Sequence, residues 1–170
     1  MLVCMGDGVF SAWRAHRKDN KELGNGVWRR AHDRYVRALD RFHQILEQDS
    51  SSTDDHAFHN SMVALANECA DLLPRVRSIC VNAQAKWPSD ENNIPGEGVQ
   101  IHRELSHTAN DLAQAAQALA MASLDNSSGG VVLNPLDSAE SVPAQNVRRR
   151  VAAVAGGVER AEAKLKELAS

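Results

Sequence analysis

Aromatic residues and cysteines are scarce in this chain. The first scarcity restricts the composition of the core, and the second restricts the disulfide bonds that can form. Aromatics make up 4% of 170 residues, and there are 3 cysteines. A core with so few aromatic rings must consist of aliphatic side chains and alanine, and alanine-rich faces let helix axes approach closely. Cys69 and Cys80 would lie roughly 16 Å apart on one helix, which is too far for a disulfide bond. At least one thiol is therefore unpaired, which predicts a reducing compartment.

Long apolar runs are also absent. The opening Met1-Leu2-Val3-Cys4-Met5 run is too short for the apolar region of a signal peptide. No segment approaches the roughly 20 uncharged apolar residues that a membrane-spanning helix needs. We therefore expect a soluble, cytoplasmic protein, with peripheral attachment to a membrane as a further option.

The sequence lacks the strong catalytic and nucleotide-binding motifs. Gly6-Asp7-Gly8, Gly24-Asn25-Gly26 and Gly96-Glu97-Gly98 each lack the lysine or the flanking strand that a phosphate-binding loop requires. The chain contains no Gly-x-Ser-x-Gly, His-Glu-x-x-His or Cys-x-x-Cys motif. These absences favour a non-enzymatic protein over an enzyme.

What the sequence does contain is four stretches with apolar residues alternately four and three positions apart. The clearest of these comprises Phe58, Met62, Leu65, Cys69, Leu72, Val76, Ile79 and Ala83. Such spacing places the apolar residues on one face of a long helix that packs against others at a shallow angle of roughly 20°. It predicts an all-α protein: an antiparallel up-down four-helix bundle, of coiled-coil type, with a short N-terminal helix.

The predicted organisation is an N-terminal amphipathic extension over 1–24 and a bundle over 25–170. The helices are expected at about 26–48, 53–87, 97–124 and 139–169, with a flexible linker over 125–138. Pro74 is expected to kink the second helix without breaking it. Gly156 and Gly157 indicate close approach of a neighbouring backbone or a weak point in the last helix. The structural alternative is a three-helix core whose last helix packs on a second copy.

Two groups of residues are candidates for binding a partner. In the extension, Phe10 and Trp13 alternate with Arg14 and Arg17, which predicts a basic amphipathic helix that binds a partner protein or an anionic membrane, or that covers one end of the bundle. On the first long helix a ridge of arginines follows 4-3-4 spacing. Its members are Arg30, Arg34, Arg37 and Arg41.

The arginine ridge differs from a typical nucleic-acid-binding surface. Asp33 and Asp40 are interleaved with the arginines, and the sequence pI is 6.1. A solvated face with i,i+4 ion pairs, such as Asp33 with Arg37, is the simpler interpretation.

Histidines and carboxylates at the two ends of the bundle are candidate metal ligands. Antiparallel packing could bring together His43, Glu47, Asp55, His56 and His59 at one end, and His32, His102, Glu104 and His107 at the other. A di-iron bundle needs two Glu-x-x-His pairs, and Glu104 with His107 is a single pair. Solvated histidines near helix ends are the simpler interpretation, so no cofactor is expected and a divalent metal is the alternative.

Taken together, these patterns predict a non-enzymatic helical interaction or scaffold module. We expect a protein partner or self-association, with an anionic membrane surface as an option and nucleic acid disfavoured. A metal-binding four-helix bundle, with or without enzymatic activity, is the second hypothesis. A nucleic-acid-binding regulator is the third.

Overall fold

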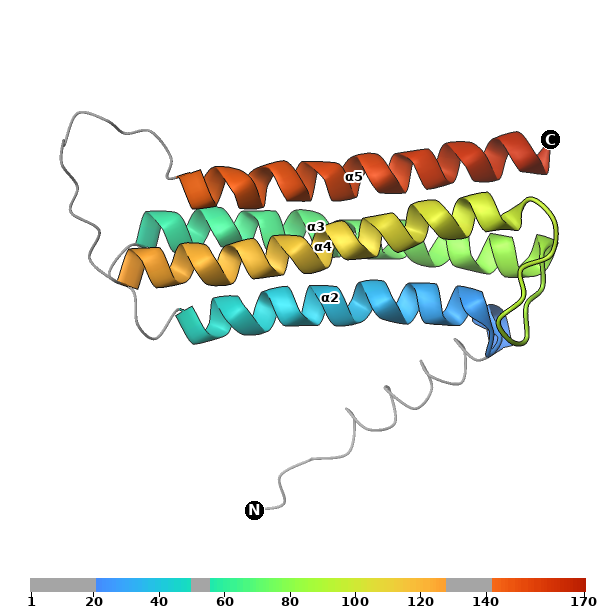
Figure 1. Cartoon of the computed structure of the whole chain (residues 1–170), viewed down its shortest axis with the longest axis horizontal. Coiled ribbons are helices and arrows are strands. Elements are labelled where there is room, and N and C mark those ends of the chain that lie inside the picture. The colour runs from blue at the N-terminus through green and yellow to red at the C-terminus, as the bar shows by residue number, and fades with distance from the viewer. Residues whose placement is uncertain (1–20, 50–55, 128–141) are drawn as a thin grey trace, which may run out of the picture.

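Four long helices make up most of the residues that the computed structural model describes, which are 21–49, 56–127 and 142–170 (Figure 1). They are α2 (Val27–Asp49), α3 (His56–Lys86), α4 (Gly98–Ser127) and α5 (Val142–Ala169). The prediction of an all-α helical bundle is confirmed, and each predicted helix lies within a few residues of an observed one. α3 continues through Pro74. None of the described helices is long and apolar enough to cross a membrane.

Consecutive helices alternate in direction, as predicted (Figure 1). They are not always neighbours, however. α2 packs against α3 and α4, and α5 packs against the same two helices, so α3 and α4 lie at opposite corners with few contacts between them. Contacts between Ser61 and Arg148 and between Arg75 and Glu162 show that α3 and α5 run parallel. The bundle is therefore two antiparallel hairpins, α2–α3 and α4–α5, placed side by side. α5 packs against α3 and α4 as the fourth helix of the bundle.

The 4-3 stripes form the core. On α3 the buried residues are Met62, Leu65, Ala66, Cys69, Leu72, Val76, Ile79, Cys80 and Ala83. Within the described ranges, the buried aromatic side chains are Trp28, Tyr35 and Phe42, and all of them come from α2. Leu23 is also fully buried, and the neighbouring Glu22 forms an ion pair with Arg77 at 2.6 Å. The bundle therefore begins before Gly24, where the sequence had placed its boundary.

The connection between α3 and α4, residues 87–97, covers the beginning of α2. The indole Nε1 of Trp28 donates a hydrogen bond to the carbonyl oxygen of Trp87 at 2.8 Å. Arg30 Nη2 donates to the carbonyl oxygen of Glu91 at 2.7 Å and to Asn92 Oδ1 at 2.8 Å. This connection can therefore cross from one corner of the bundle to the opposite corner and still be held in a fixed position.

The two adjacent glycines of α5 have different surroundings, so their replacement by alanine should have opposite effects. A Cβ at Gly157 would overlap with the side chain of Thr108 on α4, whereas at Gly156 the nearest atom is Arg160 Nη1 at 3.4 Å. Gly157→Ala should lower the free energy of unfolding by about 1–3 kcal/mol through overpacking. Gly156→Ala should raise it by up to about 1 kcal/mol through helix propensity. Urea unfolding of both variants measures the difference.

Adding Thr108→Ala to Gly157→Ala supplies the control, because it removes the hydroxyl that the new methyl group would meet. Part of the lost stability should return in the double variant. Equal effects of the two glycine substitutions would contradict the close approach of α4 to Gly157.

Candidate binding groove between α2 and α4

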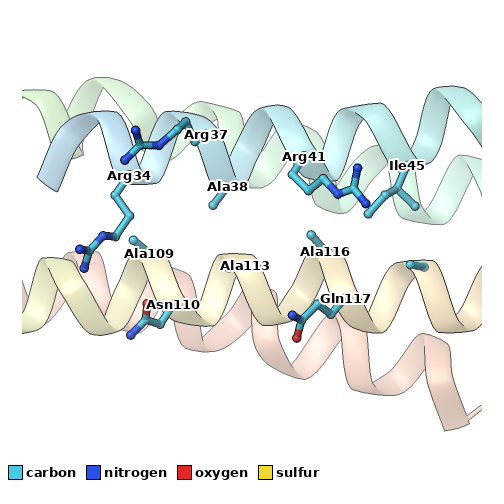
Figure 2. Close-up of a pocket in the computed structure, with 11 residues that line it drawn as sticks. Arg34, Arg37, Ala38, Arg41, Ile45, Ala109, Asn110, Ala113, Ala116 and Gln117 are labelled. Atoms are coloured by element: carbon cyan, nitrogen blue, oxygen red, sulfur yellow. The ribbon is translucent and has the colours of Figure 1, made fainter. Parts of the chain in front are cut away.

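A groove of about 420 Å³ runs along the seam between the parallel helices α2 and α4 (Figure 2). α2 contributes Arg34, Arg37, Ala38, Arg41 and Ile45. α4 contributes Ala109, Asn110, Ala113, Ala116, Gln117 and Ala120. Basic side chains thus line one side of the groove, and neutral amides line the other.

The groove exists because the side chains between the two helices are short. The alanine floor, as we call it, consists of Ala38, Ala109, Ala113, Ala116 and Ala120. On α4 these alanines follow 4-3-4 spacing, so they all face α2. A methyl group reaches only a short way from the helix backbone. Ala113 is exposed and Ala120 half-buried, so the groove is open to solvent at these two positions, whereas Ala38, Ala109 and Ala116 are buried.

The three groove arginines, Arg34, Arg37 and Arg41, are exposed, and none has an acidic partner among the residues that the structure describes. Figure 2 shows Arg34 extending from α2 across the seam toward the side where Ala109 and Asn110 lie.

The predicted pair of Asp33 with Arg37 is not formed. Asp33 instead accepts hydrogen bonds from Arg29 Nε at 3.0 Å. The side chain of Arg29 is 13% exposed, and a largely buried guanidinium needs a counter-charge more than an exposed one does. Arg37 therefore forms no pair with Asp33, and its side chain lines the groove.

Arg30, the fourth arginine of the predicted ridge, is not part of the groove. Its bonds to Glu91 and Asn92 hold it on the α3–α4 connection. With Arg34 it flanks His102, whose ring lies edge-on to Trp28 at 6.1 Å between centroids. Burial of His102, reinforced by the charges of Arg34 and Arg30, lowers its pKa.

A second cavity of about 280 Å³ continues the groove toward the C-terminal ends of both helices. Arg41, Ile45 and Ala120 line both cavities, so the two adjoin each other. The second cavity adds Leu124, which is 68% exposed, together with the polar side chains of Gln48, Asp49 and Ser123. This end of the groove is therefore mixed in character and carries one carboxylate.

The first predicted metal cluster is only partly assembled. His43, Glu47 and His59 line a cavity of about 190 Å³ between α2 and α3. His43 Nδ1 lies 3.1 Å from the carbonyl oxygen of Leu39. His56 is exposed at the start of α3, and Asp55 lies outside the described residues.

The second predicted cluster is dispersed. His32 lies 3.3 Å from Asp33, His102 packs against Trp28, and Glu104 forms an ion pair with Arg160 at 3.0 Å. His107 is exposed. Across the ranges that the structure describes, no three His, Cys, Asp or Glu side chains are placed to hold a metal ion.

The other half of the predicted partner-binding set, Phe10, Trp13, Arg14 and Arg17, lies outside the described residues and stays a prediction. Sequence reasoning missed the alanine floor and the amides Asn110 and Gln117. A signal for the floor was present, since α4 carries a second 4-3 track of alanines beside the core track of Leu105, Leu112 and Leu119.

Comparisons with protein family models, with curated proteins and with solved structures found no match to this chain. The function of the groove is therefore inferred from its lining residues.

Proposed function

We propose that this protein is a non-enzymatic interaction module that binds an acidic partner protein in the α2–α4 groove. The observation that carries the proposal is the set of groove arginines, which lack acidic partners within the described chain and line an open groove above an alanine floor.

The charges of Arg34, Arg37 and Arg41 favour an acidic ligand for a physical reason. Like charges three or four residues apart on a helix repel each other by about 0.2–0.5 kcal/mol per pair. Carboxylates of a partner would remove this repulsion. The planar guanidinium of arginine also binds a carboxylate through two parallel hydrogen bonds, which adds geometric selectivity to the charge attraction.

The lining of the groove supports binding rather than catalysis. The first cavity combines arginines with alanines, Ile45 and two amides and offers no carboxylate, imidazole, hydroxyl or thiol, and the adjoining cavity adds one carboxylate, Asp49, and one hydroxyl, Ser123. General acid–base and nucleophilic mechanisms at neutral pH use groups of those kinds. The arginines of this groove are therefore suited to holding an anionic partner.

A protein partner fits this lining better than a nucleic acid does. Proteins that bind single-stranded nucleic acid pair basic grooves with aromatic side chains on which bases stack, and no aromatic residue lines this groove. The whole chain also carries a formal net charge of -3, which opposes binding to a polyanion outside the basic seam.

Affinity capture from an extract of the native host, with three forms of the full chain, tests the proposal. The groove variant carries Arg34→Gln, Arg37→Gln and Arg41→Gln. The control variant carries Arg149→Gln, Lys164→Gln and Lys166→Gln, which remove the same charge from α5, at the corner opposite α2. We expect a protein that the wild type and the control retain and the groove variant loses, and whose binding is then reproduced with both purified components.

The affinity between the two purified proteins should fall about tenfold to hundredfold in the groove variant, since three exposed charge contacts are lost. Retention of the same protein by all three forms, or of none by any, would contradict the proposal.

A further inference from the structure

The length and regularity of the groove indicate what shape of partner it accepts. On α2 its lining runs from Arg34 to Ile45, and the adjoining cavity extends it to Asp49. This stretch corresponds to roughly 22 Å of helix, or about four turns. A seam that is straight over this length and bounded by two parallel helices favours a rod-like occupant over a compact loop.

The spacing of the lining residues matches a helix in particular. The alanine floor on α4 follows 4-3-4 spacing, and the groove arginines on α2 follow 3-4 spacing. A partner helix presents its own side chains at the same intervals along one face. Three of its carboxylates could therefore meet the three guanidinium groups in register, while its apolar side chains enter the open space above the alanines.

We propose that the α2–α4 groove binds a single amphipathic helix of a partner protein, about four turns long, with acidic residues at 3-4 spacing facing Arg34, Arg37 and Arg41 and small or aliphatic residues covering the alanine floor. This inference rests on the proposed function, because it assumes that the groove is the binding surface. It adds the secondary structure and the residue pattern of the ligand.

Three labelled synthetic peptides, each about 18 residues or roughly 27 Å long as a helix, test it by fluorescence anisotropy with the full-length protein. The patterned peptide has three glutamates at 3-4 spacing and leucine and alanine on the adjoining face. The reordered peptide has the same composition with its glutamates spread around the helix. The proline peptide is the patterned one with a proline at its centre, which breaks the helix.

The patterned peptide should bind the wild type, and the reordered and proline peptides should bind at least about tenfold more weakly, because neither can satisfy both the arginines and the floor. Ala113→Leu fills part of the alanine floor and should lower the affinity for the patterned peptide about tenfold through steric exclusion. The same enlargement on the exposed face of α3, Ala64→Leu, should change the affinity by less than about twofold.

The outcomes separate this inference from the proposed function. If all three peptides bind alike to the wild type and all lose affinity in the Arg34, Arg37 and Arg41 variant, the groove takes acidic chains without helical register, and only the helix inference fails. Absence of peptide binding while a captured protein still depends on the groove overturns the helix inference in the same way.

Peptide binding that survives both the arginine variant and Ala113→Leu contradicts both proposals. Displacement of the patterned peptide by an equal concentration of single-stranded DNA would assign the groove to nucleic acid and overturn both as well.

Discussion

Replacing Gly26 with alanine is expected to lower the free energy of unfolding by more than about 4 kcal/mol, or to prevent folding altogether. A Cβ at this position would overlap with the backbone carbonyl oxygen of Ser89. Circular dichroism during thermal and urea unfolding measures the effect.

The effect should be this large because burial and hydrogen bonds hold the backbone at Ser89 in place. Ser89 is buried, its Oγ donates a hydrogen bond to the carbonyl oxygen of Asn93 at 2.7 Å, and its amide donates to Gln84 Oε1 at 3.2 Å. Shifting this backbone would break these bonds and pull Trp87 away from Trp28. Gly26 is not among the glycines with positive φ, so the expected cost is steric.

Gly156→Ala is the matched control for this prediction, because it adds the same methyl group where the nearest atom is 3.4 Å away. A Gly26→Ala protein that unfolds within about 0.5 kcal/mol of the wild type would contradict the close contact between α2 and the α3–α4 connection.

The second large effect is expected for Leu112→Ala. Leu112 has no exposed surface, and its α4 neighbours in the stripe, Leu105 and Leu119, are buried as well. Truncation should cost about 2–5 kcal/mol, from lost transfer free energy and the cavity left behind. Urea unfolding with a constant m-value would show that the loss is one of stability.

Leu124→Ala on the same helix gives the comparison, since Leu124 is 68% exposed. Its effect on the free energy of unfolding should stay within about 0.5 kcal/mol. If Leu112→Ala were equally mild, the 4-3 stripe of α4 would not form the core.

The helices and their buried faces could be predicted from the sequence because both depend on local spacing. Residues such as Leu65, Leu112 and Val151 recur at intervals that fix one face of a helix, and burying that face is the main source of its stability. The N-terminal boundary was less accurate, because Leu23 lies just before Gly24-Asn25-Gly26 and its burial depends on contact with the assembled bundle.

The candidate site could be predicted only in part. The spacing of Arg34, Arg37 and Arg41 placed them on one ridge of a helix. Whether an arginine on that ridge is free depends on residues far along the chain or on competition for a counter-charge. Arg30 is held by residues 61 and 62 positions away, and Asp33 pairs with the less exposed Arg29.

The sequence by itself determined an all-α chain with four amphipathic helices and an arginine ridge, because helical periodicity is a property of neighbouring residues. Only the tertiary structure decided that α2 lies beside α4, since a connection over residues 87–97 can lead either to an adjacent corner or to the opposite one. That choice sets the groove arginines opposite the alanines of α4. The groove therefore results from which two helices meet, which local spacing does not specify.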